Sequence, residues 1–334
     1  SSAFPRKVVV LAGDTRQLGP VVVNGGEAET CAASVLSSSF YRDNAQVFHL
    51  TKTIRNCGDP RFSAMIDAIG DGTHPVADDG FSTINDVRTE SSVENAIDFV
   101  FPPEVLKDPV QCSKRAILSL HNISVDAIND LVLERVPGES VTLQGKTSLD
   151  HEQTEGDIDD AFAMFEYLSL LSHSGVPENS INLKKGVVVI LCRNLSIDER
   201  LTNGTKVVVL DINAHILQVQ TLDDQRTVHF LPRITFTFVT WQGVAVKRVQ
   251  FPVRLSFCVT VHRAQGQTLE RCCVDFTLDP FTHGHVYVAL SRVRRSDDMI
   301  ILTSRDRIDS NGHAKVQNVV FETLLPELHV CVSP

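Results

Sequence analysis

A block of closely spaced strands divides this chain into unlike parts. Residues 186–253 contain short β-branched or alternating runs separated by Asn-Gly, Asp and Pro turns, a pattern typical of a small β-barrel or sheet. The segments on either side instead pair apolar strands with amphipathic helices, which favours an α/β fold with a parallel sheet. We therefore expect an α/β protein with a β insert. The strands expected in the insert cover 187–191, 206–210, 216–220, 227–231 and 235–240.

The flanking segments carry their own strand and helix signals. The β-branched run 8–12 ends at a Gly-Asp pair, as a buried parallel strand does where it leads into a polar loop. Residues 59–70 show helical spacing between an Asp-Pro start and a Gly end. Residues 71–109 have only weak periodicity, so we expect mostly loop there. Further strands are expected at 116–120, 254–260 and 299–303, and further helices over 157–172, over 283–291 and after Asn122, with Ile128, Leu131 and Val132 on one face.

Length and charge narrow the class of protein. At roughly 150 residues per domain, 334 residues predict two or three domains. The chain carries 31 Lys and Arg against 41 Asp and Glu, a net charge of −10, which excludes a protein that coats nucleic acid by bulk charge. No apolar run approaches the roughly 18 residues of a membrane span, and residues 1–7 lack the apolar core of a secretion signal. We expect an intracellular protein without membrane association.

Cysteines and histidines show no metal or disulfide pattern. The eight cysteines are scattered without a C-x-x-C pair, so we expect most of them to be buried thiols that pack as small apolar side chains. His283 and His285 form a pair with no apparent third ligand. We therefore predict no metal site.

Residue types suited to phosphate chemistry recur in short polar segments. Hydrolysis of a nucleoside triphosphate needs donors and cations that converge on the γ-phosphate. Gln17, Arg55 and Arg292 meet that need, because guanidinium groups bind phosphate oxygens in a bidentate manner; the alternative for each arginine is a surface ion pair. The segments are G-D-T-R-Q-L-G-P at 13–20, L-T-K-T-I-R-N at 50–56, T-V-H-R-A-Q-G-Q-T at 260–268 and Y-V-A-L-S-R-V at 287–293.

In this order the four segments resemble the later motifs of superfamily 1 helicases, namely G-D-x-x-Q-L-x-P, L-x-x-x-x-R, T-x-H-K-S-Q-G-x-T and Y-V-A-L-S-R. The resemblance is to the petite integration frequency (PIF) family of 5′-to-3′ DNA helicases, in particular to the helicase domain of Helitron transposons. It covers nearly the whole chain. Supporting matches are found at 70–75, 193–195, 203–205, 231–234 and 250–252.

The resemblance assigns nucleotide-binding roles, with ATP and Mg²⁺ as the implied cofactors. Gln17 would sense the γ-phosphate or its attacking water, Arg55 would reach the phosphate, and Arg292 would act as an arginine finger. These three are the implied catalytic residues. The implied cofactor-binding set is Gly13, Asp14, Gln17, Arg55, Gly266, Gln267 and Arg292.

The resemblance also assigns contacts to single-stranded DNA, where hydroxyl, amide and basic groups would meet backbone phosphates. The alternative for the segment after Thr260 is a polar turn beyond a core strand, and for Asn122 it is helix capping. Three departures from the family pattern are Gly19 for an apolar residue, Arg263-Ala264 for Lys-Ser, and His285 for Gln. The implied DNA-binding residues are Asn122, Thr260, His262, Arg263 and Gln265.

Two elements of a complete nucleotide site are not found in this sequence. There is no G-x-x-x-x-G-K-[ST] phosphate loop and no Asp-Glu pair after an apolar strand before Val8. We expect both upstream of Ser1, so that this chain alone would not hydrolyse ATP. The resemblance then implies a remnant of the first RecA-like domain over 1–56, a second RecA-like domain of the P-loop NTPase fold over 57–185 and 254–330, and an SH3-like β-barrel insert over 186–253.

Two functional hypotheses follow. The first is the C-terminal part of an ATP-dependent 5′-to-3′ DNA helicase that acts in DNA repair, recombination, telomere maintenance or transposition. Its partners would be single-stranded DNA and the missing RecA-like lobe, and we expect a monomer in the nucleus, with the mitochondrion as the alternative location. The second is a non-catalytic, transposon-derived module that binds single-stranded nucleic acid.

Overall fold

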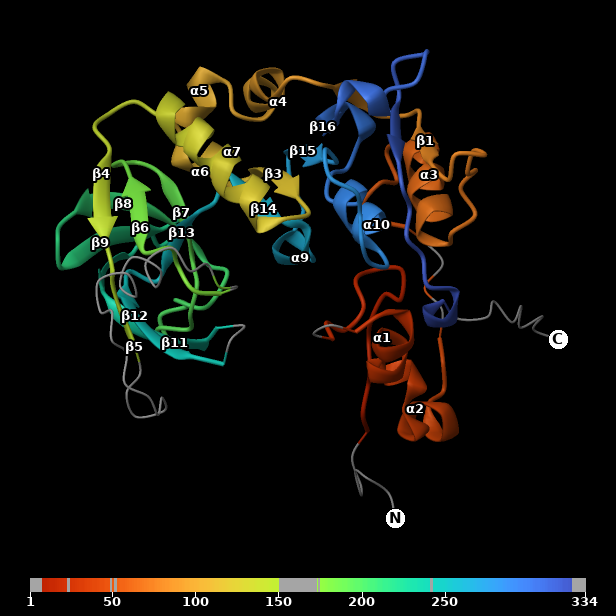
Figure 1. The fold of residues 1–334 in the computed structure, drawn as a ribbon, viewed down its shortest axis with the longest axis horizontal. Helices are drawn as coiled ribbons and strands as arrows, with labels where there is room; N and C mark the ends of the chain where they lie inside the picture. Colours follow the sequence, from red (N-terminus) through yellow and green to blue (C-terminus); the bar gives the residue numbers. More distant parts are fainter. Residues whose placement is uncertain are drawn as a thin grey trace. The chain divides into compact units, whose positions relative to one another are not determined.

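The chain divides into two compact units in the computed structural model (Figure 1). Unit 1 comprises Ser1–Ser91, Ala264–Thr268 and Val274–Pro334, and unit 2 comprises Ser92–Arg263 and Leu269–Cys273. The structure describes residues 8–22, 25–48, 50, 53–149, 173, 175–240 and 243–325. The helix expected over 157–172 and Cys331 lie outside the described residues.

Helices α3 and α10 pack against each other in unit 1. Helix α3 (Pro60–Gly70) begins where the Asp59 carboxylate accepts a hydrogen bond from the backbone N–H of Phe62, and it buries its apolar face, as its sequence predicts. Helix α10 (His285–Leu290) confirms the helix expected over 283–291. The remaining elements are α1 (Glu27–Ala33), η1 (Val35–Ser37), α2 (Ser39–Asn44), β1 (Ser82–Ile84), β2 (Arg88–Glu90), η2 (Ser296–Asp298), β16 (Met299–Leu302), η3 (Arg305–Arg307), β17 (Ala314–Val316) and η4 (Glu322–Leu324).

Two strand pairs organise the remainder of unit 1. Strand β16 pairs in parallel with β2, which confirms the strand expected at 299–303, and β1 pairs with β17 in the antiparallel sense. The strand expected at 8–12 is wrong: Val8 and Val10 are 94% and 83% exposed, and the segment has no strand structure. A parallel strand needs a neighbour for its backbone groups, and none of the described residues supplies one.

The loop expected over 71–109 is present over 71–81, but it is wrong beyond that point, where short elements replace it. Strands β1 and β2 are followed by α4 (Val93–Val100), α5 (Pro103–Leu106) and α6 (Pro109–Ser113). Ser92 caps α4 by accepting from Asn95 N–H, and Asp108 caps α6 by accepting from Val110 N–H. Helix α4 buries Ala96, Ile97 and Val100 at helical spacing, so its period was present in the sequence, whereas α5 and α6 hold too few residues to show one.

A parallel strand pair and a helix form the α/β part of unit 2. Strand β3 (Arg115–Ser119) pairs in parallel with β14 (Cys258–Thr260), and α7 (Asn122–Arg135) follows β3. Asn129 of α7 donates to Cys258 O and accepts from its N–H, so it faces the sheet. The expectation for Leu131 is wrong, because it is 41% exposed while Asn129 is buried. The paired backbone hydrogen bonds explain why a polar residue takes the inner face.

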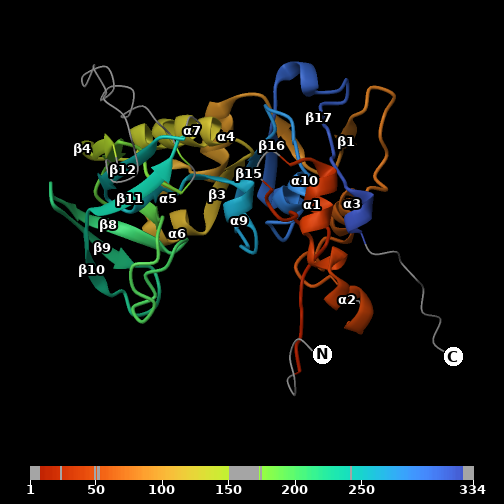
Figure 2. The same ribbon diagram turned by 60° about the horizontal axis from the view of Figure 1, so that its bottom comes forward.

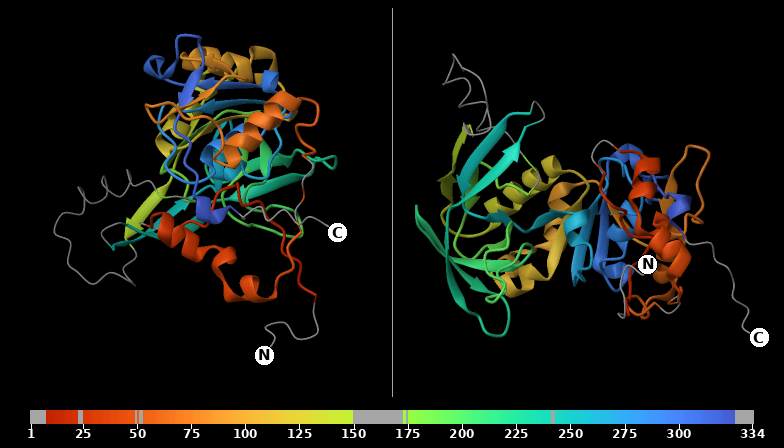
Figure 3. Two further views of the ribbon diagram at one scale, coloured as in Figure 1. Left: turned by 90° about the vertical axis from the view of Figure 1, so that its right-hand side faces the viewer. Right: turned by 90° about the horizontal axis from the view of Figure 1, so that it is seen from below.

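The insert consists of antiparallel strands, visible as the green and cyan arrows in the right-hand view of Figure 3. All five expected strands are present, as β7 (Val188–Leu191), β8 (Lys206–Ile212), β9 (Ile216–Thr221), β10 (Val228–Pro232) and β11 (Ile234–Val239). The strand expected at 254–260 is split into β13 (Val253–Leu255) and β14. The order in one sheet is β10-β9-β8-β7-β13, and a second sheet joins β11, β12 (Ala245–Gln250) and β5 (Lys146–Leu149).

Apolar packing ties these layers together within unit 2. Val176, Cys192, Phe236, Phe238 and Val246 form one buried cluster, and α6 packs against β7. Figure 2 shows β8, β9 and β10 side by side in the larger sheet of the insert. Strands β4 (Val141–Gln144) and β6 (Ser180–Leu183) form a separate pair, and α9 (Val261–Ala264) and β15 (Arg271–Asp275) contribute residues to both units. The α/β class is confirmed; the SH3-like form of the insert and the domain boundaries stay predictions.

Two other expectations concern the described residues. Five of the seven described cysteines are buried, as expected, whereas Cys57 is exposed and Cys31 is partly exposed. Across the residues that the structure describes, no helix is both long enough and apolar enough to cross a membrane.

Candidate functional site

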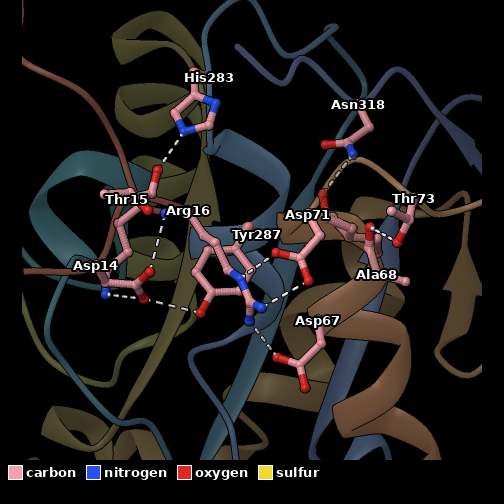
Figure 4. Close-up of polar contacts among 12 residues, drawn as sticks. Asp14, Thr15, Arg16, Asp67, Ala68, Asp71, Thr73, His283, Tyr287 and Asn318 are labelled. Atoms are coloured by element: carbon pink, nitrogen blue, oxygen red, sulfur yellow. Dashed lines mark hydrogen bonds and ion pairs between the residues drawn. The ribbon is translucent and has the colours of Figure 1, made fainter. Parts of the chain in front are cut away.

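The Asp14–Gln17 loop is organised by one carboxylate. Asp14 accepts hydrogen bonds from Arg16 N–H at 3.1 Å and from the Tyr287 hydroxyl at 3.0 Å (Figure 4). It also accepts from Gln17 Nε2 at 3.0 Å. Burial and the neighbouring Asp14 carboxylate raise the pKa of Tyr287 to about 12. The phenol therefore keeps its proton at neutral pH and remains a donor. The loop is thus a fixed arrangement of polar groups.

A five-residue turn, residues 264–268, meets all three predicted phosphate-contacting side chains. Gln265 Nε2 donates to Gln17 Oε1 at 3.0 Å, and Arg55 Nε donates to Thr268 Oγ1 at 3.2 Å. Arg292 Nη1 donates to the carbonyls of Ala264 and Gln267 at 3.3 and 3.2 Å. Residues far apart in sequence therefore converge on this turn. Its centre is Gly266, whose φ of +82° is a conformation that side chains disfavour.

Arg55 reaches this turn from the side of a polar cavity of about 250 Å³ in unit 1. Arg55 Nη1 also donates to Ser291 O at 2.8 Å, and Asn56 Nδ2 donates to Val293 O at 2.7 Å, so two adjacent side chains attach the segment to the end of α10. A guanidinium on the wall of a polar cavity can bind an anion. The wall is formed by Asp14, Arg16, Leu50, Thr53, Ile54, Arg55, Asn56, Ser63, Ile66, Asp67, Tyr287 and Ser291.

Arg292 is almost completely buried. Only 1% of it is exposed, and besides the turn its guanidinium donates to Val288 O at 2.6 Å and to Ser291 Oγ at 2.6 Å. In this structure the side chain therefore binds backbone carbonyls and holds the turn against α10. Its role as an arginine finger stays a prediction. Gln267 enters the network through its carbonyl, and Gly13 is exposed.

The predicted DNA-contacting residues of unit 2 follow the carboxyl ends of two paired parallel strands. Thr260 ends β14 opposite Ser119 of β3, and Asn122 begins α7 just beyond β3. Ligands of α/β sheets bind at this edge. The N-cap of α7 is His121, so the capping alternative for Asn122 is wrong. Asn122 is exposed, whereas burial lowers the pKa of His262 and keeps that ring neutral at pH 7.

Arg263, the basic residue of this segment, is partly buried and lies near both a basic and an acidic side chain. Burial lowers the pKa of Arg263, and the nearby Arg254 acts in the same direction, while Asp126 opposes it. Burial in turn raises the pKa of Asp126. Thr260, His262 and Arg263 belong to unit 2, whereas Gln265 belongs to unit 1 and contacts Gln17. DNA contact by these residues stays a prediction.

His283 serves the loop rather than a metal ion. Its Nε2 donates to Thr15 O at 2.8 Å (Figure 4). Its Nδ1 accepts from Phe321 N–H at 2.9 Å, so both ring nitrogens are used by the backbone. His285 packs edge-on against Phe281, with ring centroids 4.6 Å apart. The described part of the chain holds no group of three side chains able to bind a metal ion.

Sequence reasoning missed an ionic contact beside the cavity. Arg16 Nε and Nη2 donate to the two oxygens of Asp71 at 2.7 and 2.8 Å, and Nη1 donates to Asp67 at 2.8 Å. Burial alone would lower the pKa of Arg16, but the two carboxylates outweigh it and raise the pKa. The signal in the sequence was the acidic pair four residues apart at the C-terminal end of α3, where helices favour cations.

Comparisons with known proteins agree on one family. The model "PIF1-like helicase" matches residues 1–80, and the model "DNA helicase Pif1, 2B domain" matches residues 166–212. The ATP-dependent DNA helicase PIF1 of Xenopus laevis is 26% identical over 308 residues, which covers 88% of this chain and 40% of the relative. The human PIF1 is 26% identical over 298 residues, with the same two coverages. The chain thus spans about two fifths of the length of these relatives.

Solved structures give the same result. The Pif1 helicase from Candida albicans is similar with a TM-score of 0.56 and 25% identity, over 87% of this chain and 63% of that one. The Bacteroides Pif1 helicase in complex with ADP-AlF3 and ssDNA has a TM-score of 0.56 over 94% of this chain and 63% of that one, and at 16% identity it supports the fold alone. The family models, the relatives and the solved structure from Candida albicans together support a PIF1-type superfamily 1 helicase.

Proposed function

We propose that this chain is part of an ATP-dependent 5′-to-3′ DNA helicase that couples ATP hydrolysis to movement along single-stranded DNA and to duplex unwinding. The observation that carries the proposal is the turn 264–268, which receives Gln17, Arg55 and Arg292. The same segment continues directly from Thr260–Arg263, the predicted DNA contacts. Nine consecutive residues therefore link both predicted functions, so a shift at one end displaces the other.

The residues of unit 1 suit the charge that develops during phosphoryl transfer. Arg55 lines the cavity and can neutralise phosphate oxygens, and the Gln17 amide, held between Asp14 and Gln265, can orient a water or a phosphate oxygen. The described residues contain no set of three metal-binding side chains. In the proposal the phosphate loop and the Mg²⁺ ligands belong to the remainder of a longer protein, and this chain alone does not hydrolyse ATP.

The test is DNA-stimulated ATPase activity of the full-length protein that contains this chain. Arg55→Ala and Gln17→Ala should each lower kcat by roughly 10²-fold, the usual loss when one charge-stabilising group is removed. Arg61→Ala is the matched control, because the Arg61 side chain is exposed and forms an ion pair with Asp86 at 2.6 Å. ATPase activity that is unchanged in both variants would contradict the proposal. Arg292→Ala is unsuitable as the main test, since it would leave several buried carbonyls without donors.

The burial of Arg292 favours a second candidate function, a non-catalytic module that binds single-stranded nucleic acid. An arginine whose guanidinium is buried against backbone carbonyls can have a structural role in a fold that no longer hydrolyses ATP. This candidate predicts single-stranded DNA binding by a full-length protein that lacks ATPase activity. Binding should weaken with added salt and with Arg263→Ala, and fluorescence anisotropy with a labelled oligonucleotide measures both.

The first candidate function extends to several further proposals. They are roles in DNA repair, recombination, telomere maintenance or transposition, and residence in the nucleus or the mitochondrion.

A further inference from the structure

Two carboxylates at the C-terminal end of α3 occupy positions that helix electrostatics disfavour. Asp67 and Asp71 are four residues apart at the C-terminal end of the helix, where they repel each other and meet the negative end of the helix dipole. Arg16 compensates both charges with three hydrogen bonds of 2.7 to 2.8 Å. A helix end that carries unfavourable charges, and depends on one residue distant in sequence to neutralise them, indicates a functional contact.

Two glycines allow the Arg16 segment to approach the helices closely. A Cβ on Gly70, the last residue of α3, would lie 2.8 Å from Arg16 Cδ and 2.7 Å from the Tyr287 ring. A Cβ on Gly284, whose φ is +77°, would lie 2.7 Å from the backbone oxygen of Arg16 and within 2.9 Å of Gln17. Larger residues would therefore push the loop away from both α3 and α10.

The loop is held on several sides at once. Arg16 binds α3, His283 Nε2 donates to Thr15 O at 2.8 Å, and the Tyr287 hydroxyl donates to Asp14 at 3.0 Å (Figure 4). The guanidinium uses Nε and both Nη atoms on carboxylates. With all three of its nitrogens engaged by the end of α3, the guanidinium holds the loop in place.

We propose that Arg16 is a positioning residue that ties the Asp14–Gln17 loop to Asp67 and Asp71 and thereby holds the Gln17 amide at the turn 264–268. The inference rests on the proposed function, because it gives Arg16 a role in the reaction in which Gln17 takes part. Gln17 Oε1 accepts from Gln265 Nε2 at 3.0 Å only while the loop keeps its place. A small displacement of a reacting group costs a large rate factor.

The decisive experiment measures DNA-stimulated ATPase kinetics of the full-length protein for Arg16→Ala, Gln17→Ala and the double variant. Arg16→Ala should lower kcat by roughly 10- to 100-fold while KM for ATP changes by less than about twofold. In the Gln17→Ala background, Arg16→Ala should cause no further loss, because it acts through Gln17. Arg16→Lys should recover part of kcat, since lysine supplies the charge without the bidentate fork. Arg61→Ala, in α3 itself, should retain full activity.

A second measurement separates this inference from the proposed function. Amide hydrogen exchange of residues 12–22 should become faster in Arg16→Ala and in Asp71→Asn but not in Arg61→Ala. Two results would overturn the role of Arg16 alone. One is unchanged amide exchange in Arg16→Ala, and the other is a loss of kcat on Arg16→Ala that is the same in the Gln17→Ala background as in the natural protein. A full-length protein without any ATPase activity would instead overturn the proposed function, and with it the catalytic consequence of the loop contact.

Discussion

Lys206 shows at the residue scale how burial changes the acid–base behaviour of the insert. Its Nζ donates to Ser113 O at 2.6 Å, at the end of α6, and burial lowers its pKa to about 8. Since unfolded lysine titrates near roughly 10.4, the unfolded chain binds more protons between about pH 8 and 10. Stability from this group therefore rises with pH in that window.

We predict that Lys206→Met removes this rise, which is on the order of 1 kcal/mol per pH unit. Denaturant unfolding at pH 7.5, 9 and 10 measures it. Cys112 has the opposite effect, because burial raises its pKa to about 11, so only the difference between the natural protein and the variant isolates Lys206. Lys185→Met is the control, since Lys185 is exposed and pairs with Asp211. Parallel pH profiles for the natural protein and Lys206→Met would contradict the prediction.

At the element scale, the start of α3 connects two parts of unit 1. The Asp59 carboxylate accepts from Phe62 N–H at 3.2 Å and from the Ser296 N–H and hydroxyl at 3.0 and 2.7 Å. The Ser296 backbone bond is the main reason that the pKa of Asp59 is lowered. We predict that Asp59→Ala costs about 2–3 kcal/mol of unfolding free energy, more than the roughly 1 kcal/mol of an ordinary cap.

Chemical denaturation tests this, with Ser92→Ala as the ordinary cap, because Ser92 accepts from Asn95 N–H and its other hydrogen bond, to the Glu94 carboxylate, is exposed. The excess loss should disappear as the pH falls through the lowered pKa of Asp59, since a protonated carboxyl group binds the Ser296 donors weakly. Equal losses for the two caps at neutral pH would show that the Ser296 contact contributes nothing.

The same elements show what sequence can predict. The cap of α3 and the strands of the insert were predictable, because both depend on neighbours in sequence: an Asp-Pro start and a period of two. The strand at 8–12 was not, because a strand forms only when another strand pairs with it. The Asp59–Ser296 and Arg16–Asp71 contacts join residues 237 and 55 positions apart. Residue types in the motifs indicated Gln17, Arg55 and Arg292, whose catalytic roles stay predictions, whereas the inward direction of Arg292 depends on packing that no motif encodes.

At the scale of the whole molecule, the proposed coupling depends on the conformation of the turn 264–268. Gly266 has a φ of +82°, and a Cβ placed on it would have no neighbouring atom within 4 Å, so Gly266→Ala adds backbone strain without a clash. That strain is roughly 1–2 kcal/mol. Relief would move Gln265 and Thr268 and weaken their bonds to Gln17 and Arg55.

We therefore predict that Gly266→Ala in the full-length protein reduces the stimulation of ATPase by single-stranded DNA roughly 10-fold, with DNA affinity nearly unchanged. Gly312→Ala is the matched control, because Gly312 has a φ of +86° and equally open surroundings, in a turn before β17. Both variants should lose similar stability, yet only Gly266→Ala should separate DNA binding from hydrolysis. If both variants retain full stimulation, or if Gly266→Ala loses DNA affinity instead, this turn does not couple the two activities.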